Sequence, residues 1–151
     1  MKKKSAFILA MCLGICVLFG GCSSNTADSS EKEGGIIDLT AHSADRVYAE
    51  VYNMMFEPEQ YLGKTIIMEG PYTYGGYDEK NKEHHHYIII EDAEACCQQG
   101  LEVLLPKKYE YPKDYPKEEE KVRAEGVYEG YEYEGNIYYR IVTDKLEKVD
   151  A

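Results

Sequence analysis

Cysteine is scarce in the part of this sequence that has the composition of a folded domain. The chain has five cysteines, but three lie within the first 22 residues, and only the adjacent pair Cys96 and Cys97 follows. One adjacent pair cannot form a disulfide scaffold. The pair is also hard to bridge, because neighbouring Cα atoms lie about 3.8 Å apart, whereas an unstrained disulfide needs roughly 4.4–6.8 Å.

The motifs of several enzyme classes are also missing. The sequence has no glycine-rich loop of the Walker or dinucleotide-binding type, no zinc-protease helix motif and no nucleophile elbow. The run from 78 to 82 lacks the spacing of a calcium loop. No basic residue flanks Cys96 and Cys97, and the neighbouring acids, Asp92 among them, raise the pKa of a thiol. We therefore expect a non-catalytic protein, with a thiol-dependent enzyme as the least favoured alternative.

Basic residues are few relative to acidic ones. Three of the 17 basic residues precede Cys22, whereas all 28 acidic residues follow it, so the chain from Cys22 onward has a net charge of −14. Such a surface repels phosphate backbones and anionic lipid headgroups. We expect no nucleic-acid partner, and we expect membrane attachment through a lipid rather than a basic patch.

The N-terminus has the pattern of an export signal. Three lysines at positions 2–4 precede an apolar run from 7 to 19, and the run ends in LFGGC at residues 18–22. The run is short for a membrane span, and LFGGC resembles the lipobox of bacterial lipoproteins. The resemblance implies cleavage before Cys22 and attachment of a lipid such as palmitate to it. An uncleaved anchor or a plain secretory peptide is the alternative.

These observations divide the chain into three parts. Residues 1–21 are predicted to be a lipoprotein signal peptide, residues 22–37 a flexible tether rich in small and polar residues, and residues 38–151 the folded domain. The predicted location is extracytoplasmic, in the cell envelope, anchored to the cell membrane.

The predicted domain is mainly β. Helical spacing of apolar residues predicts one helix over 44–56, with Ser43 as N-cap and Pro58 ending it. Alternating patterns then predict five strands, over 64–70, 84–90, 101–106, 121–130 and 136–149. A five-stranded antiparallel sheet of this size tends to close. We therefore expect a five-stranded OB-like barrel preceded by one α-helix, with an open α+β sheet as the alternative.

The stretch HHHYIIIEDAEACCQQG, residues 84–100, suggests a transition-metal site. On a strand His84 and His86 share one face, and Cys96 or Cys97 can join them if the connection folds back, with Asp92 as an oxygen ligand. Such a set suits zinc or copper. The alternatives are a solubilising histidine cluster and a small, inert core cysteine.

Tyrosine is abundant, with fifteen residues. Tyr109, Tyr111 and Tyr115 lie in a proline-rich loop without a packing period, which favours a protein- or glycan-recognition surface. Other tyrosines lie on or between the last two strands, and packing is the favoured role for two of them, Tyr128 and Tyr139.

The segment YLGKTIIMEG at residues 61–70, the Asp92, Cys96-Cys97 and Gly100 cluster, LEVLLP at 101–106 and EGVYEG at 125–130 carry a family resemblance. Over about residues 57–142 the chain resembles small OB-type lipoproteins of Gram-positive bacteria with no assigned activity. More distantly it is similar to the C-terminal domain of YcgQ-like membrane proteins, which are associated with a permease. The resemblance implies the fold, an envelope location, a permease or other envelope protein as partner and a link to metal or small-solute handling. It implies no catalytic residues, and His84–His86 lie outside the pattern.

The sequence thus predicts a membrane-anchored extracytoplasmic lipoprotein that acts as a non-catalytic binding or accessory module. The leading hypothesis is transition-metal binding through Cys96, Cys97, His84, His86 and Asp92. The alternative is a recognition module that uses the tyrosine-rich loop.

Overall fold

The computed structural model describes residues 35–149 of the chain. The predicted signal peptide, the lipidation site Cys22 and most of the tether lie outside these residues. Two short 3-10 turns, one α-helix and six strands make up the described part: β1 (Ile36–Asp38), η1 (Leu39–Ala41), α1 (Ala44–Phe56), η2 (Pro58–Gln60), β2 (Thr65–Asp78), β3 (Glu83–Glu91), β4 (Gln98–Leu104), β5 (Lys121–Tyr133) and β6 (Asn136–Lys148).

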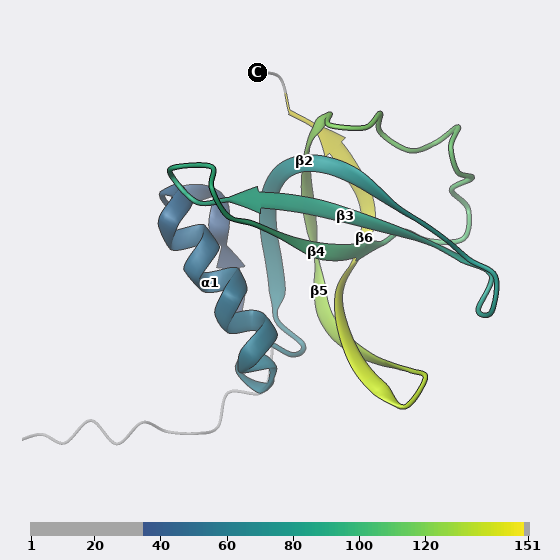
Figure 1. Ribbon diagram of the computed structural model, residues 1–151, viewed down its shortest axis with the longest axis horizontal. Helices are drawn as coiled ribbons and strands as arrows, with labels where there is room; N and C mark the ends of the chain where they lie inside the picture. Colours follow the sequence, from purple (N-terminus) through teal and green to yellow (C-terminus); the bar gives the residue numbers. More distant parts are fainter. Residues whose placement is uncertain (1–34, 150–151) are drawn as a thin grey trace, which may run out of the picture. The chain divides into compact units, whose positions relative to one another are not determined.

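Strands β2 to β6 close into a barrel (Figure 1). Strand β2 pairs with β3 and β3 with β4, both antiparallel. Strand β4 then pairs in parallel with β6, β6 pairs antiparallel with β5, and β5 returns to β2 and closes the ring. This confirms the five-stranded OB-like barrel, and the open sheet is wrong. Strand β1 was not predicted; it pairs in parallel with β2, outside the ring.

The domain starts slightly before the predicted boundary. Ile36 and Ile37 already pair with β2, so ordered structure begins two residues before residue 38. The predicted tether had included these residues because two apolar side chains are too few to show a strand period.

Strand β2 serves two partners because it bends. Its first half, Thr65–Pro71, pairs with β5, and its second half, from Tyr72 on, pairs with β3. The change of partner falls between Pro71 and Tyr72, directly after Gly70. A Cβ atom at Gly70 would lie 2.1 Å from the Ile89 carbonyl oxygen, so only glycine allows the two strands to approach this closely here.

The core fills the barrel interior. Buried and less buried residues alternate along most of β3 and β5. Ile66 and Met68 of β2 have no exposed surface. The same cluster includes the side chains of Leu39, Val51, Met54, Tyr61, Tyr72, Ile88, Ile90, Leu101, Val103, Val122, Ala124, Tyr128 and Ile141.

Helix α1 has the predicted bounds and lies against the barrel beside β3 and β4 (Figure 1). It buries Val51 and Met54, and the Tyr128 hydroxyl donates a hydrogen bond of 2.8 Å to the Met54 carbonyl. Ser43 holds the N-cap position, although its side chain forms no capping hydrogen bond. Packing therefore holds this helix more than its cap does. Neither α1 nor any other helix within residues 35–149 is long and apolar enough to cross a membrane.

Candidate functional site

The two halves of the predicted metal site lie at opposite ends of β3. His84 and His86 stand in its first part, next to the β2–β3 hairpin, whereas Asp92, Cys96 and Cys97 follow its last residue. The strand continues for five residues after His86, which corresponds to about 17 Å. One site that joins the histidines to the cysteines is therefore wrong, because a single strand holds its two ends apart.

The cysteine half does form a compact cluster. Ligand atoms of Asp92, Cys96 and Cys97 all lie within 4.8 Å of one another. The Cys96 thiol donates to Asp92 Oδ2 at 3.1 Å, and the two sulfur atoms are 3.6 Å apart. Both cysteines are free and exposed. Neither fills the core, so the small-core-residue alternative is wrong for both.

The thiol of Cys96 is poorly suited to nucleophilic attack. Its hydrogen bond to the Asp92 carboxylate, and then the neighbouring Cys97, raise the pKa of Cys96 to about 11. A nucleophilic cysteine needs the opposite shift. The acidic sequence neighbours predicted this direction.

The histidine half meets the tyrosine-rich loop instead. Tyr111 stacks on Tyr74 of β2 with ring centroids 4.3 Å apart, and Tyr115 stacks on His86 at 4.1 Å. The rings of His84 and Tyr111 are 4.9 Å apart. The loop between β4 and β5 is thus held against the barrel by ring packing, a contact that no sequence period could reveal.

Tyr109 lies apart from Tyr111 and Tyr115, with the Lys108 ammonium 5.2 Å from its ring centroid. The three loop tyrosines therefore do not form the single recognition surface that the sequence suggested. Two of them pack inward against the barrel, and their rings are partly used for stability.

His86 is a core residue. Its side chain is 2% exposed, and its Nδ1 atom lies 2.7 Å from the Tyr72 hydroxyl. Burial, and then the neighbouring His84 and His85, lower the pKa of His86 to about 4. Its Nε2 atom has no hydrogen-bond partner among the described residues. This histidine is therefore neutral at pH 7.

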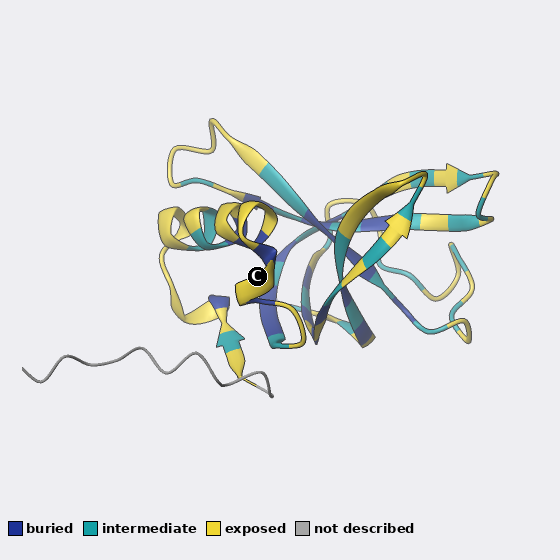
Figure 2. Ribbon diagram, turned by 90° about the horizontal axis from the view of Figure 1, so that it is seen from below, coloured by how far each residue is buried: buried dark blue, intermediate teal, exposed yellow. Residues whose placement is uncertain are grey.

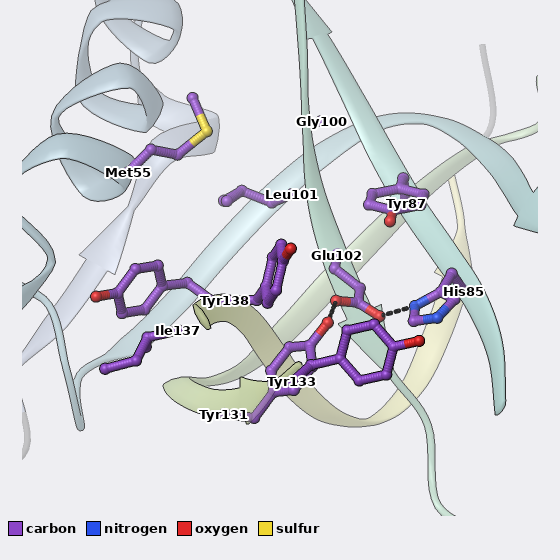
Figure 3. Close-up of a pocket in the computed structure, with 11 residues that line it drawn as sticks. Met55, His85, Tyr87, Gly100, Leu101, Glu102, Tyr131, Tyr133, Ile137 and Tyr138 are labelled. Atoms are coloured by element: carbon purple, nitrogen blue, oxygen red, sulfur yellow. Dashed lines mark hydrogen bonds and ion pairs between the residues drawn. The ribbon is translucent and has the colours of Figure 1, made fainter. Parts of the chain in front are cut away.

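A different tyrosine cluster lines a pocket of about 450 Å³ on the outer face of β3, β4, β5 and β6 (Figure 3). Most of its wall is aromatic, and a histidine and a carboxylate lie among the rings. The lining residues are Met55, His85, Tyr87, Gly100, Leu101, Glu102, Tyr131, Tyr133, Ile137, Tyr138 and Tyr139. We call it the tyrosine pocket. In OB-type barrels the face of the second and third strands is a common ligand site, and β3 and β4 are those strands here.

Glu102 is the polar centre of the tyrosine pocket. Its Oε1 atom lies 2.6 Å from Nδ1 of His85, and its Oε2 atom accepts a hydrogen bond of 2.6 Å from the Tyr131 hydroxyl (Figure 3). Burial and this bond raise the pKa of Tyr131. His85 and the Tyr131 hydroxyl thus orient both carboxylate oxygens, and Glu102 is only 9% exposed. A carboxylate that is largely shielded from water attracts a cation more strongly than a free surface acid does.

The ring of Tyr131 already binds a cation. The Arg140 guanidinium carbon lies 4.3 Å from the centroid of that ring, and Arg140 Nε donates to Glu129 at 3.0 Å. The wall of the pocket therefore combines the Glu102 carboxylate with aromatic faces, the two kinds of group that favour a positive charge.

Two hairpin turns are tied together beside the pocket. The Tyr133 hydroxyl of β5 donates to Asp78 of β2, and Lys80 pairs with Glu134. The Asp78 hydrogen bond, and then burial, raise the pKa of Tyr133 to about 12. The β2–β3 and β5–β6 turns thus form one connected rim.

The opposite end of the pocket is apolar. Met55 of α1 and Ile137 of β6 lie at the end away from His85 (Figure 3), and Ile137 is 65% exposed. Tyr52 and Phe56 stack on each other at 4.3 Å along the exposed side of the same helix turn. Figure 2 shows both the helix surface and the β5–β6 hairpin largely exposed. We call Tyr52, Met55, Phe56, Ile137 and Tyr138 the apolar lip.

Sequence reasoning assigned no site to these residues, although signals were present. On β3 His85 points away from the face that carries His84 and His86, and on β4 Glu102 stands between the core residues Leu101 and Val103. An acid or histidine between buried neighbours marks the outer face of a strand. What the pattern could not show is that these two outer faces meet the tyrosines of β5 and β6.

No protein-family model matches the chain, and no curated protein matches it. The resemblance to small OB-type lipoproteins therefore stays a prediction, and the function has to be inferred from the geometry of the two clusters and the pocket.

Proposed function

We propose that this chain is a membrane-anchored extracytoplasmic lipoprotein whose OB-like domain recognises a basic segment of a partner protein of the cell envelope, such as a permease. The observation that carries the proposal is the tyrosine pocket, in which aromatic rings surround the largely buried carboxylate of Glu102. The domain acts by binding and not by catalysis.

The charge of the pocket selects for a cation. The Glu102 carboxylate can pair with a lysine or arginine side chain, and the ring faces of Tyr131, Tyr133 and Tyr138 can contact the aliphatic stem and the charge. The net charge of −14 from Cys22 onward adds long-range attraction for a basic partner and repels anionic ones.

The apolar lip indicates a peptide. Exposed apolar side chains next to a charged pocket suit a segment in which an apolar residue follows a basic one. A neutral oligosaccharide could use the ring faces and hydroxyl groups but would bring no positive charge to the Glu102 carboxylate. Peptide recognition is therefore favoured over glycan recognition.

The chemistry of the lining supports binding over nucleophilic catalysis. Within the pocket His85 is paired with Glu102, but the lining has no serine, threonine or cysteine for such a pair to activate. The thiol of Cys96 lies outside the pocket and has a raised pKa.

Fluorescence anisotropy tests the proposed recognition. The probe is a labelled peptide of alternating lysine and leucine, with glutamate in place of lysine in the control peptide and chitotetraose as a glycan competitor. The lysine peptide is expected to bind, and Tyr138→Ala to weaken it by at least about tenfold, or about 1.4 kcal/mol. Tyr109→Ala, on the packed loop, is the matched control and should leave the affinity unchanged.

Two results would overturn the proposal. One is equal binding of the lysine and glutamate peptides, which would show that the pocket charge does not matter. The other is binding of chitotetraose without any binding of the lysine peptide, which would show a glycan module.

The anchoring part of the proposal rests on LFGGC at residues 18–22 and is tested separately. In the native host the protein should partition into the detergent phase of a Triton X-114 extract, with a mass increase on Cys22. Cys22→Ala should move it to the aqueous phase, because the attached acyl chains provide the membrane affinity. Detergent-phase partitioning of the variant without a mass shift would show an uncleaved anchor instead.

A further inference from the structure

The cluster of Asp92, Cys96 and Cys97 lies outside the tyrosine pocket and takes no part in recognition there. We propose that these three side chains form a binding site for a thiophilic d10 cation of the zinc type, with two thiolates and one carboxylate as ligands and the fourth position open to solvent or to a ligand from another molecule. The histidines of β3 do not contribute.

Two of the three distances between the donor atoms are close to those of a tetrahedral site, and all three lie within 4.8 Å. Bonds of about 2.3 Å to sulfur and 2.0 Å to oxygen place two sulfurs roughly 3.8 Å apart and a sulfur and an oxygen roughly 3.5 Å apart. The structure has 3.6 Å between the two sulfurs and 3.1 Å between Cys96 Sγ and Asp92 Oδ2. An ion therefore fits with movements of a few tenths of an ångström.

The backbone holds the donors in place without a metal. Asp92 Oδ1 accepts a hydrogen bond of 2.9 Å from the Cys96 amide, and the Asp92 amide donates to the Cys97 carbonyl at 3.2 Å. The loop is tied to α1 by the Ala93 amide, which donates to Asp45 Oδ1 at 2.9 Å. Little conformational entropy is then lost on binding.

The ligand set selects the kind of metal. Two thiolates favour zinc, cadmium or copper(I) over calcium and magnesium, which prefer oxygen ligands. The sequence 91–98 contains three acids and no basic residue, so the surroundings attract a cation. Binding replaces the proton of each thiol by a metal–sulfur bond and releases both protons to solvent, so affinity must rise with pH.

The fourth coordination position of the proposed site is open. Both sulfur atoms are exposed, whereas structural zinc sites are closed by four protein ligands. A three-ligand site at the surface suits exchange of the ion with another molecule more than permanent storage.

Titration of the reduced, metal-free full-length chain in detergent with Cd²⁺ tests the site, because thiolate coordination produces an ultraviolet charge-transfer band. We expect a saturable band that zinc displaces and that strengthens between pH 6 and pH 8, and we expect Cys96→Ser/Cys97→Ser to remove the part of the band that this site contributes. The double variant retains the N-terminal cysteines, so the difference between the two titrations isolates this site.

Two further variants separate the ligands. Asp92→Asn should weaken binding by about tenfold or more, and His84→Ala, the matched control, should leave it unchanged. An unaltered band in the double cysteine variant would overturn the proposal, as would an equal loss in His84→Ala. Circular dichroism confirms that each variant is folded. Peptide binding to the tyrosine pocket is measured on the same samples and is expected to stay at the wild-type value.

Discussion

Each of the three consecutive histidines of β3 has its own environment, because successive residues of a strand face opposite sides. His86 is buried against Tyr72 and Tyr115, His84 is exposed beside Tyr111, and His85 points to the outer face and pairs with Glu102. The sequence showed that the histidines alternate between the two faces, but it did not show which side chains each of them contacts. Whether a histidine is a metal ligand, a core residue or part of a pocket depends on distant side chains. Glu102 lies 17 residues from His85 in the sequence, and Tyr131 lies 29 residues from Glu102.

The low pKa of His86 makes the stability of the domain depend on pH. The folded-state pKa of about 4 lies below the ordinary value of roughly 6.5, so the unfolded chain takes up the proton first as the pH falls. The stabilisation is fully present above about pH 6.5 and is lost as the pH falls toward 4, and the total loss is about 3 kcal/mol.

Urea denaturation at several pH values between 7 and 4.5 measures this effect. His86→Phe removes the titrating group, so its stability should fall less steeply with acid than that of the wild type, even if it is lower at pH 7. His84→Phe, at the exposed neighbour, should keep the wild-type slope. Parallel curves for wild type and His86→Phe would contradict the account.

At the scale of elements, local pattern was a good guide wherever an element packs on one side. The helix over 44–56 and the strands at 84–90 and 136–149 were predicted within one or two residues, because each carries a clear apolar period. Strand β1 was not predicted, and only the first half of the long bent strand β2 was predicted as a strand. Both depend on tertiary pairing, since β1 exists only beside β2, and β2 continues past Pro71 only because its hydrogen-bonding partner changes there.

The bend of β2 predicts a large effect at one glycine. Gly70→Ala places a Cβ atom 2.1 Å from the Ile89 carbonyl oxygen and 2.9 Å from Ile88 Cγ2, so β2 and β3 must separate. We expect a loss of about 2 kcal/mol or more in the free energy of unfolding. Gly35→Ala, whose Cβ would meet nothing nearer than 3.7 Å, is the control and should change stability by less than about 0.5 kcal/mol. Equal stabilities of the two variants in urea would refute the role of the close approach.

At the scale of the whole molecule, a closed five-stranded barrel could be predicted from the alternating strands and the closure of a small sheet, whereas the parallel pairing of β4 with β6 could not. The tyrosine pocket could not, because its lining comes from α1, β3, β4, β5 and β6. The sequence placed the recognition surface on the proline-rich loop, whose tyrosines had no packing period, yet two of these rings pack inward. Tyr131, Tyr133 and Tyr138 of β5 and β6 line the pocket instead, although the sequence assigned no site to them. Tyr128, for which packing was predicted, is buried and stacks on Tyr139.

Of the predicted metal site, only the part that is local in the sequence lies together in the structure. The prediction that Cys96, Cys97 and Asp92 act together fits the geometry, because they are close in sequence and share one loop. The histidines were added because they are near in sequence, but a strand of nine residues separates near neighbours by most of its length. Proximity in sequence is a guide to contact across a turn and not along a strand.

The central claim is that the carboxylate of Glu102 in the tyrosine pocket binds a basic side chain. The most direct measurement is a double-mutant cycle on peptide affinity, with Glu102→Gln in the protein and norleucine in place of lysine in the peptide. A lysine–Glu102 contact predicts that the wild type prefers the lysine peptide by at least about tenfold and that Glu102→Gln removes this preference while remaining folded. An unchanged preference for lysine in Glu102→Gln would contradict the claim and place the binding site elsewhere on the acidic surface.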